Sequence, residues 1–154
     1  MNALTEYRRT LIERLAEAAQ DFCTACESTM PAQDNMAGEW SLHQVAAHVR
    51  DIQRAAYGAR VRRSLVEENP LFESVDPDEW MAAHYNKEEP LQKILDEFKT
   101  DVDDLCKVLR GIPDETWASP SQHETMGAGL TLQLWVEQGL AHIQEHLNAV
   151  RDLT

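Results

Sequence analysis

Four long segments of this 154-residue chain place their apolar side chains three and four residues apart. This spacing follows the 3.6-residue turn of an α-helix, and no segment of similar length alternates apolar and polar residues as a half-buried strand would. The segments span about residues 2–26, 41–67, 90–111 and 131–151. Four amphipathic helices of similar length predict an all-α fold with the architecture of a four-helix bundle.

The second helical segment and the two long connections carry the clearest boundary signals. Ser41 can cap the helix that follows it, while Gln44, three residues later, reaches back to the backbone amide of the cap. Residues 68–88 contain two prolines and several acids. We therefore expect a long connection there, a crossover or a lid, with one short helical turn near residues 78–84. Residues 112–130 are expected to form a loop.

The size and charge of the chain narrow the classes of function. A chain of this length can bury a core of its own, so we expect residues 1–154 to form one domain. The net charge of −13 repels phosphate backbones and anionic lipid headgroups, which argues against nucleic acid as a partner. No apolar stretch reaches the roughly 18 to 20 residues of a membrane span, and the first residues lack the apolar region of a signal peptide. We expect a cytoplasmic protein that does not bind membranes.

Three cysteines, an odd number in a chain without a secretion signal, fit a reducing compartment. Cys23 and Cys26 form a Cys-x-x-Cys motif, which can support redox or zinc chemistry. The motif lies late in a helical segment, however, with no preceding strand and no second pair. We therefore expect Cys23, Cys26 and Cys106 to pack in the core as small apolar residues.

Three histidines are the candidate functional residues. His142 and His146 lie four residues apart in the last segment, so one helix face directs both imidazoles toward a common point. His48 falls on the apolar side of the second segment and faces the bundle interior. Each could be a core histidine bonded to a carbonyl or carboxylate, but three on inward or boundary positions favour a metal site. Imidazole ligands suit zinc, nickel, manganese and iron alike.

The remaining candidates are expected to lie outside this site. His43, five residues before His48, projects to the polar side of its helix, where we expect it to be solvated. His84 and His123 lie in the two connections and are expected on the surface, with substrate contact as the alternative for His123. Glu145 points away from the site, so a surface charge is favoured over a general base.

Taken in order, these residues resemble the DinB-like (DinB/YfiT) superfamily of metal-binding four-helix bundles, and the resemblance covers essentially the whole chain. It rests on Trp40-Ser41 before the inward His48, and on Gly127-Ala-Gly-Leu-Thr131-Leu132 before His142 and His146. The resemblance implies an up-up-down-down bundle with a long crossover between the second and third helices. It also implies a divalent metal, commonly zinc or nickel, held by His48, His142 and His146, and often a homodimer.

Three histidine ligands leave a coordination position open for water or substrate, which is typical of a catalytic site rather than a structural one. The ion can lower the pKa of bound water for hydrolysis, or hold a thiolate for S-transfer. Because characterised relatives use low-molecular-weight thiols, the resemblance favours a thiol-dependent S-transferase acting on a small-molecule substrate. A metal-dependent hydrolase and a non-catalytic bundle that binds a metal or small molecule are the alternatives. The sequence assigns no general base.

Overall fold

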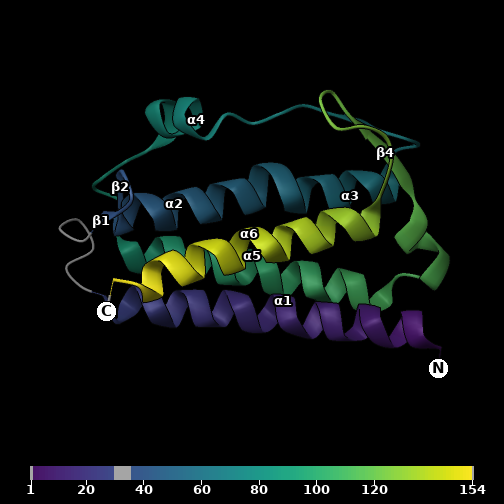
Figure 1. Cartoon of the computed structure of the whole chain (residues 1–154), viewed down its shortest axis with the longest axis horizontal. Coiled ribbons are helices and arrows are strands. Elements are labelled where there is room, and N and C mark those ends of the chain that lie inside the picture. Colours follow the sequence, from purple (N-terminus) through teal and green to yellow (C-terminus); the bar gives the residue numbers. More distant parts are fainter. Residues whose placement is uncertain (1, 30–35, 154) are drawn as a thin grey trace.

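The computed structural model describes residues 2–29 and 36–153, whose long helices form a bundle of four rods (Figure 1). Three rods are the single helices α1 (Ala3–Glu27), α5 (Leu91–Gly111) and α6 (Leu132–Arg151). The fourth rod consists of α2 (Leu42–Ile52), the π-helical turn η1 (Gln53–Tyr57) and α3 (Gly58–Val66), joined end to end. The predicted bundle is thus confirmed. None of the described helices is both long and apolar enough to cross a membrane.

Short elements fill the connections between the rods. The crossover from α3 to α5 contains the short helix α4 (Pro77–His84), close to its expected place. A 3₁₀ turn, η2 (Asp114–Ala118), follows α5. Within the described residues, five short strands form two small sheets, an antiparallel pair and a three-stranded sheet of order β3-β4-β5 in which β3 and β4 are parallel. They are β1 (Met36–Ala37), β2 (Trp40–Ser41), β3 (Leu71–Phe72), β4 (Pro120–His123) and β5 (Gly127–Thr131).

These strands correct the expectation of a purely α-helical chain and of a loop over residues 112–130. They are two to five residues long, which is too short to give a recognisable period-two pattern in the sequence. The two sheets lie near opposite ends of the bundle (Figure 1). They pair segments of the connections with one another and leave the helical architecture unchanged.

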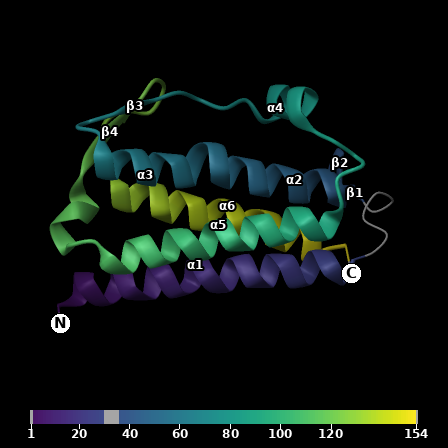
Figure 2. The same ribbon diagram turned by 180° about the vertical axis from the view of Figure 1, so that it is seen from behind.

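The helix directions differ from the expected up-up-down-down order. The starts of α1 and α6 meet where Arg8 donates to Gln133, whereas the start of α5 meets the end of α1 where Gln92 donates to Glu27. In Figures 1 and 2 the rod α2–α3 runs in the same direction as α5. The order is therefore up-down-down-up, and the prediction was wrong. The reason is the crossover: a connection that returns along the whole bundle makes the two helices it joins parallel, and here it joins α3 to α5.

The four rods bury one contiguous apolar cluster between them. Within it, Phe22 of α1 and Phe98 of α5 meet edge to face, with ring centroids 5.6 Å apart. Cys23, Cys26 and Cys106 are buried in the same cluster, so their predicted packing role is confirmed. Burial raises the pKa of the Cys23 thiol to about 12. A thiol of this kind is protonated at neutral pH and unreactive.

The rod α2–η1–α3 has a well-defined start and an irregular middle. Ser41 and Gln44 form the predicted capping box at its first turn. At the π-helical turn, a Cβ on Gly58 would come within 2.7 Å of the carbonyl oxygen of Gln53, so only glycine fits. The π turn adds a residue to the helix and thereby changes which side chains face α6. One of them is Tyr57, whose ring reaches the histidines described next.

Candidate metal centre

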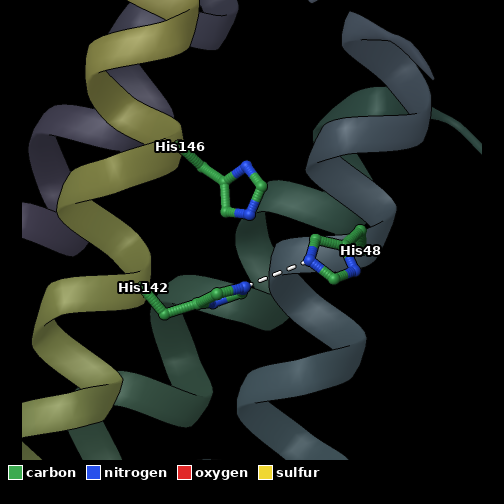
Figure 3. A group of neighbouring side chains, drawn as sticks. All are labelled: His48, His142 and His146. Carbon is green, nitrogen blue, oxygen red and sulfur yellow. Dashed lines mark hydrogen bonds between the residues drawn. The ribbon is translucent and has the colours of Figure 1, made fainter. Parts of the chain in front are cut away.

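The structure brings together the three histidines that the sequence singled out. His48 extends from α2, and His142 and His146 extend from successive turns of α6, so that the three rings converge (Figure 3). One nitrogen from each ring can be chosen so that all three lie within 4.8 Å of one another. The Nε2 atoms of His48 and His142 are 3.1 Å apart.

This arrangement fits a divalent metal ion. Tetrahedral coordination with metal–nitrogen bonds of about 2.0–2.1 Å places ligand nitrogens roughly 3.3 Å apart. The contact between His48 and His142 is already close to that value at 3.1 Å, and the remaining separations, at most 4.8 Å, can close by small side-chain rotations. Two facing imidazole nitrogens can form a hydrogen bond only if one of them carries a proton. A cation would satisfy both lone pairs at once.

The surroundings keep the three imidazoles neutral. His48 is buried, and His142 and His146 are partly buried. Burial, and then the nearby His146, lowers the pKa of His48 to about 4. Burial also lowers the pKa of His142 to about 3, with smaller contributions from His146 and His48. Burial lowers the pKa of His146 as well, and the exposed Glu145 opposes this shift. At neutral pH all three rings therefore offer unprotonated nitrogens.

Two aromatic side chains flank the cluster. The ring of Trp40 lies 4.8 Å from that of His48, and the ring of Tyr57 lies 5.3 Å from that of His142. Gly139 of α6 makes room for Tyr57, because a Cβ at this position would lie 3.2 Å from the Cβ of Tyr57. Sequence reasoning missed Tyr57 and Gly139. An isolated glycine inside a helical segment was the available signal, since it often marks a close approach of a neighbouring element.

His43 does not lie on a solvated face, so that prediction was wrong. Its side chain is fully buried, with Nδ1 2.6 Å from the hydroxyl of Tyr85 and Nε2 2.7 Å from the carbonyl oxygen of Glu89. Both partners belong to the end of the crossover, which covers this side of α2. The periodicity of one helix cannot show that a distant segment will cover its polar side.

The two histidines of the connections lie apart from the cluster. His84 is exposed, as expected, and stacks on Trp80 with ring centroids 4.0 Å apart. His123, at the end of β4, is 7% exposed and accepts hydrogen bonds at Nδ1 from the backbone amides of Thr125 and Met126. The expected surface position of His123 was therefore wrong. The turn between β4 and β5 holds its ring through these hydrogen bonds to Nδ1.

Comparison with known proteins agrees with this fold. The chain matches the DinB superfamily over residues 3–150 and belongs to that family. Among solved structures it is similar to YfiT from Bacillus subtilis, described as a probable metal-dependent hydrolase with an unusual four-helix bundle topology. The two share 22% sequence identity with a TM-score of 0.86, over 99% of this chain and 87% of that one. At this identity the likeness establishes the fold. No curated protein matches the chain.

Proposed function

We propose that His48, His142 and His146 bind one divalent metal ion, and that the protein is a metal-dependent enzyme acting on a small molecule. The observation that carries the proposal is the convergence of three neutral imidazoles from two helices, with two Nε2 atoms 3.1 Å apart. Zinc and nickel are the first candidates, and manganese and iron also accept imidazole ligands. Three protein ligands leave a position for water or substrate, as catalytic sites require.

The bound ion would supply Lewis acidity and a lowered pKa for a bound nucleophile. The chain supplies the geometry. His142 and His146 are held one turn apart on α6, and His48 approaches them from α2 (Figure 3). Trp40 and Tyr57 replace water on two sides of the cluster, which strengthens electrostatic interactions there. We assign no general base, since Glu145 is exposed.

For the specific reaction we propose S-transfer from a low-molecular-weight thiol. Uncharged ligands leave the ion its full positive charge, which favours binding of a thiolate, and the family resemblance points to such thiols. Metal-dependent hydrolysis is the second candidate, because the similar fold of YfiT is described as that of a probable metal-dependent hydrolase. A non-catalytic bundle that binds a metal or small molecule is the third.

The metal content of untagged protein tests the site directly. After incubation with zinc or nickel and desalting, inductively coupled plasma mass spectrometry should find near one ion per chain. His48→Ala should remove the ion, whereas His84→Ala, a control at an exposed histidine outside the cluster, should retain it. Wild-type protein without metal after this treatment would overturn the proposal.

A turnover screen separates the three candidate functions. The metal-loaded protein is given an electrophile with bacillithiol, mycothiol or glutathione, and ester and amide substrates without thiol. Turnover that requires both metal and thiol identifies a transferase, and turnover without thiol identifies a hydrolase. Absence of metal-dependent turnover in every arm favours the non-catalytic bundle.

Three further expectations stay predictions: one domain over residues 1–154, a homodimer and a cytoplasmic location. Analytical ultracentrifugation of the metal-loaded protein tests the homodimer directly. A sedimentation coefficient that matches a 17.5 kDa species at micromolar concentration would contradict it.

A further inference from the structure

We propose that Arg60 and His123 form an oxyanion-binding subsite beside the histidine cluster, and that the substrate therefore carries a carboxylate or phosphate group. The role of this subsite in turnover rests on the proposed function. The binding of an oxyanion does not, because it requires no metal.

Arg60 of α3 is a buried charge without a counter-ion. The residue is 8% exposed, and its one side-chain hydrogen bond runs from Nη2 to the backbone carbonyl of Glu73, at 3.2 Å. No carboxylate of the described residues lies within ion-pair distance of it. Its guanidinium carbon lies 4.7 Å from the ring centroid of Trp135 and 5.7 Å from that of Tyr57. Burial lowers the pKa of Arg60, opposed by a smaller effect of Tyr57. Most of the N–H donors of this guanidinium are free for a ligand.

Arg50 shows how the same rod neutralises a buried arginine that serves the fold. It is also 8% exposed, but it forms ion pairs with Asp51 at 2.9 Å, Glu89 at 2.7 Å and Glu97 at 3.0 Å. An unpaired buried charge costs several kilocalories per mole that such partners would offset. In a chain with 27 acidic residues, the lack of one beside Arg60 indicates a place for an external anion.

His123 supplies a second donor in the same neighbourhood. Its Nδ1 accepts from the amides of Thr125 at 3.2 Å and Met126 at 3.3 Å, so the neutral ring carries its proton on Nε2. That Nε2–H has no acceptor among the described residues. Burial, and then the positive charge of Arg60, lowers the pKa of His123. The ring of His123 lies 6.1 Å from that of Trp135, the indole that Arg60 also contacts. Arg60 and His123 thus both lie near Trp135, and each has a hydrogen-bond donor without an acceptor in the described part of the chain. An oxyanion can accept hydrogen bonds from both.

A cavity gives a ligand access to Arg60. It has a volume of about 690 Å³, lies between the rod α2–η1–α3 and residues 71–84, and is lined in part by Arg60, Phe72 and Trp80. This volume suits a small molecule. Arg63 also lines the cavity, but Glu67 already pairs with it. The acidic lining residues are exposed, so water screens their repulsion of an anion more than it screens the buried guanidinium. They are Glu73, Asp76 and Glu79.

Tyr57 connects this subsite to the candidate metal centre. Its ring lies 5.7 Å from the guanidinium carbon of Arg60 and 5.3 Å from the ring of His142. A substrate whose anionic group binds Arg60 can therefore extend along Tyr57 toward the histidines. The substrate class that fits is a small molecule that carries a carboxylate or phosphate apart from its reacting group, with Tyr57 between the two binding positions.

Calorimetric titration of metal-free protein with inorganic phosphate and, separately, with succinate tests the subsite. We expect Arg60→Gln to weaken the binding of the preferred anion by about 10-fold to 100-fold, the range for a hydrogen-bonded charge. Arg60→Lys should weaken binding less, because the positive charge remains. Some loss is still expected, because lysine lacks the planar fork of donors. The matched control Arg63→Gln, which removes an arginine already paired on the same cavity, should change affinity less than about twofold. Whichever of phosphate and succinate binds more tightly identifies the oxyanion.

Binding of neither anion to the wild type, or equal binding to Arg60→Gln, would overturn the subsite. Thermal unfolding gives a second readout. Arg60→Gln should unfold at or above the wild-type temperature because it removes an uncompensated charge, whereas Arg50→Gln should unfold at a lower temperature. An equal loss in both variants would mean that Arg60 only supports the fold. If Arg60→Gln does not fold, Arg60→Lys carries the binding test. If the protein takes up metal but binds no oxyanion, this inference alone is refuted. If it binds an oxyanion but takes up no metal when loaded with zinc or nickel, the proposed function alone is refuted.

Discussion

His43 and His48 lie five residues apart on α2, and both are buried, with exposed fractions of 0% and 6%. Their nitrogens meet different partners. His43 is enclosed by a hydroxyl and a carbonyl, so Nε2–H donates to Glu89 while Nδ1 accepts from Tyr85. The Nε2 atom of His48 instead lies 3.1 Å from the Nε2 atom of another imidazole, His142.

This difference separates a structural histidine from a candidate ligand. The partners of His43 fix one tautomer and use both nitrogens, which leaves no lone pair for a metal. The cluster around His48 gathers several lone pairs of the same kind at one point, and such an arrangement is suited to a shared cation. Burial alone would have grouped the two histidines together. The chemistry of their partners distinguishes them.

Metal affinity should show the largest difference between the two sides of α2. His48→Ala removes one of three ligands, and since a complete zinc site is worth about 10–16 kcal/mol, we expect roughly a thousand-fold weaker binding. His43→Ala should leave affinity within a few-fold of wild type. Competition of each protein with a chromogenic zinc chelator measures both. Equal losses of metal affinity in the two variants would contradict the distinction between a ligand at His48 and a structural histidine at His43.

The pH dependence of stability should separate the same two regions in metal-free protein. The pKa of His48 is about 4 when folded and about 6.5 when unfolded, so the unfolded chain binds the extra proton between these values. The contribution of His48 to stability should therefore fall by on the order of 3 kcal/mol as the pH drops from 6.5 to 4, and His142 and His146 should add to this loss. On the His43 side, a hydrogen bond from Arg50 lowers the pKa of Glu89 to about 2. The stability supplied by Glu89 is present above pH 4.5 and is lost as the pH falls toward 2.

Urea unfolding at several pH values distinguishes the two windows. His48→Ala should remove the part of the loss between pH 6.5 and 4 that His48 supplies, while the parts from His142 and His146 and the loss below pH 4.5 remain. His84→Ala, at an exposed histidine, should follow the wild-type curve throughout. A His48→Ala curve that parallels wild type across the upper window would contradict the assigned shift.

Replacing His43 should lower stability more than replacing His48 in metal-free protein at pH 7. His43→Ala leaves the Tyr85 hydroxyl and the Glu89 carbonyl without their partner, and we expect a loss of about 2 kcal/mol. His48→Ala removes a side chain that contacts another imidazole, and it should cost about half as much. The urea concentration at the unfolding midpoint, together with an unchanged dependence of the free energy of unfolding on urea, gives both losses. The opposite ranking would assign the structural role to His48.

The sequence was sufficient for the parts of this comparison that depend on one helix at a time. The 3.6-residue period placed His142 and His146 on one face of a helix and turned His48 inward. The capping signal at Ser41 located the start of α2. These features follow from local geometry, which a single segment encodes.

The parts that failed depend on where distant segments pack. His43 is buried because the end of the crossover covers it, and nothing within α2 indicates this cover. The helix order was wrong because the direction of α5 follows from the course of the crossover. Arg60 and Tyr57 acquire their significance only beside Trp135 and His142, which belong to another helix.

The smallest expected effect concerns Gly139, which affects the cluster side of α2 alone. Gly139→Ala would place a Cβ 3.2 Å from the Cβ of Tyr57, tighter than ordinary packing, so Tyr57 must shift by a few tenths of an ångström. Because the ring of Tyr57 packs on that of His142, we expect metal affinity to fall about threefold to tenfold. The environment of His43, on the opposite side of α2, should be unchanged. Chelator competition measures the affinity, and histidine ring resonances in NMR spectra report the two sides separately. If the ring resonances of His43 shifted while those of His142 did not, the two sides of α2 would be coupled through the helix. The two histidines could then not be treated as separate regions.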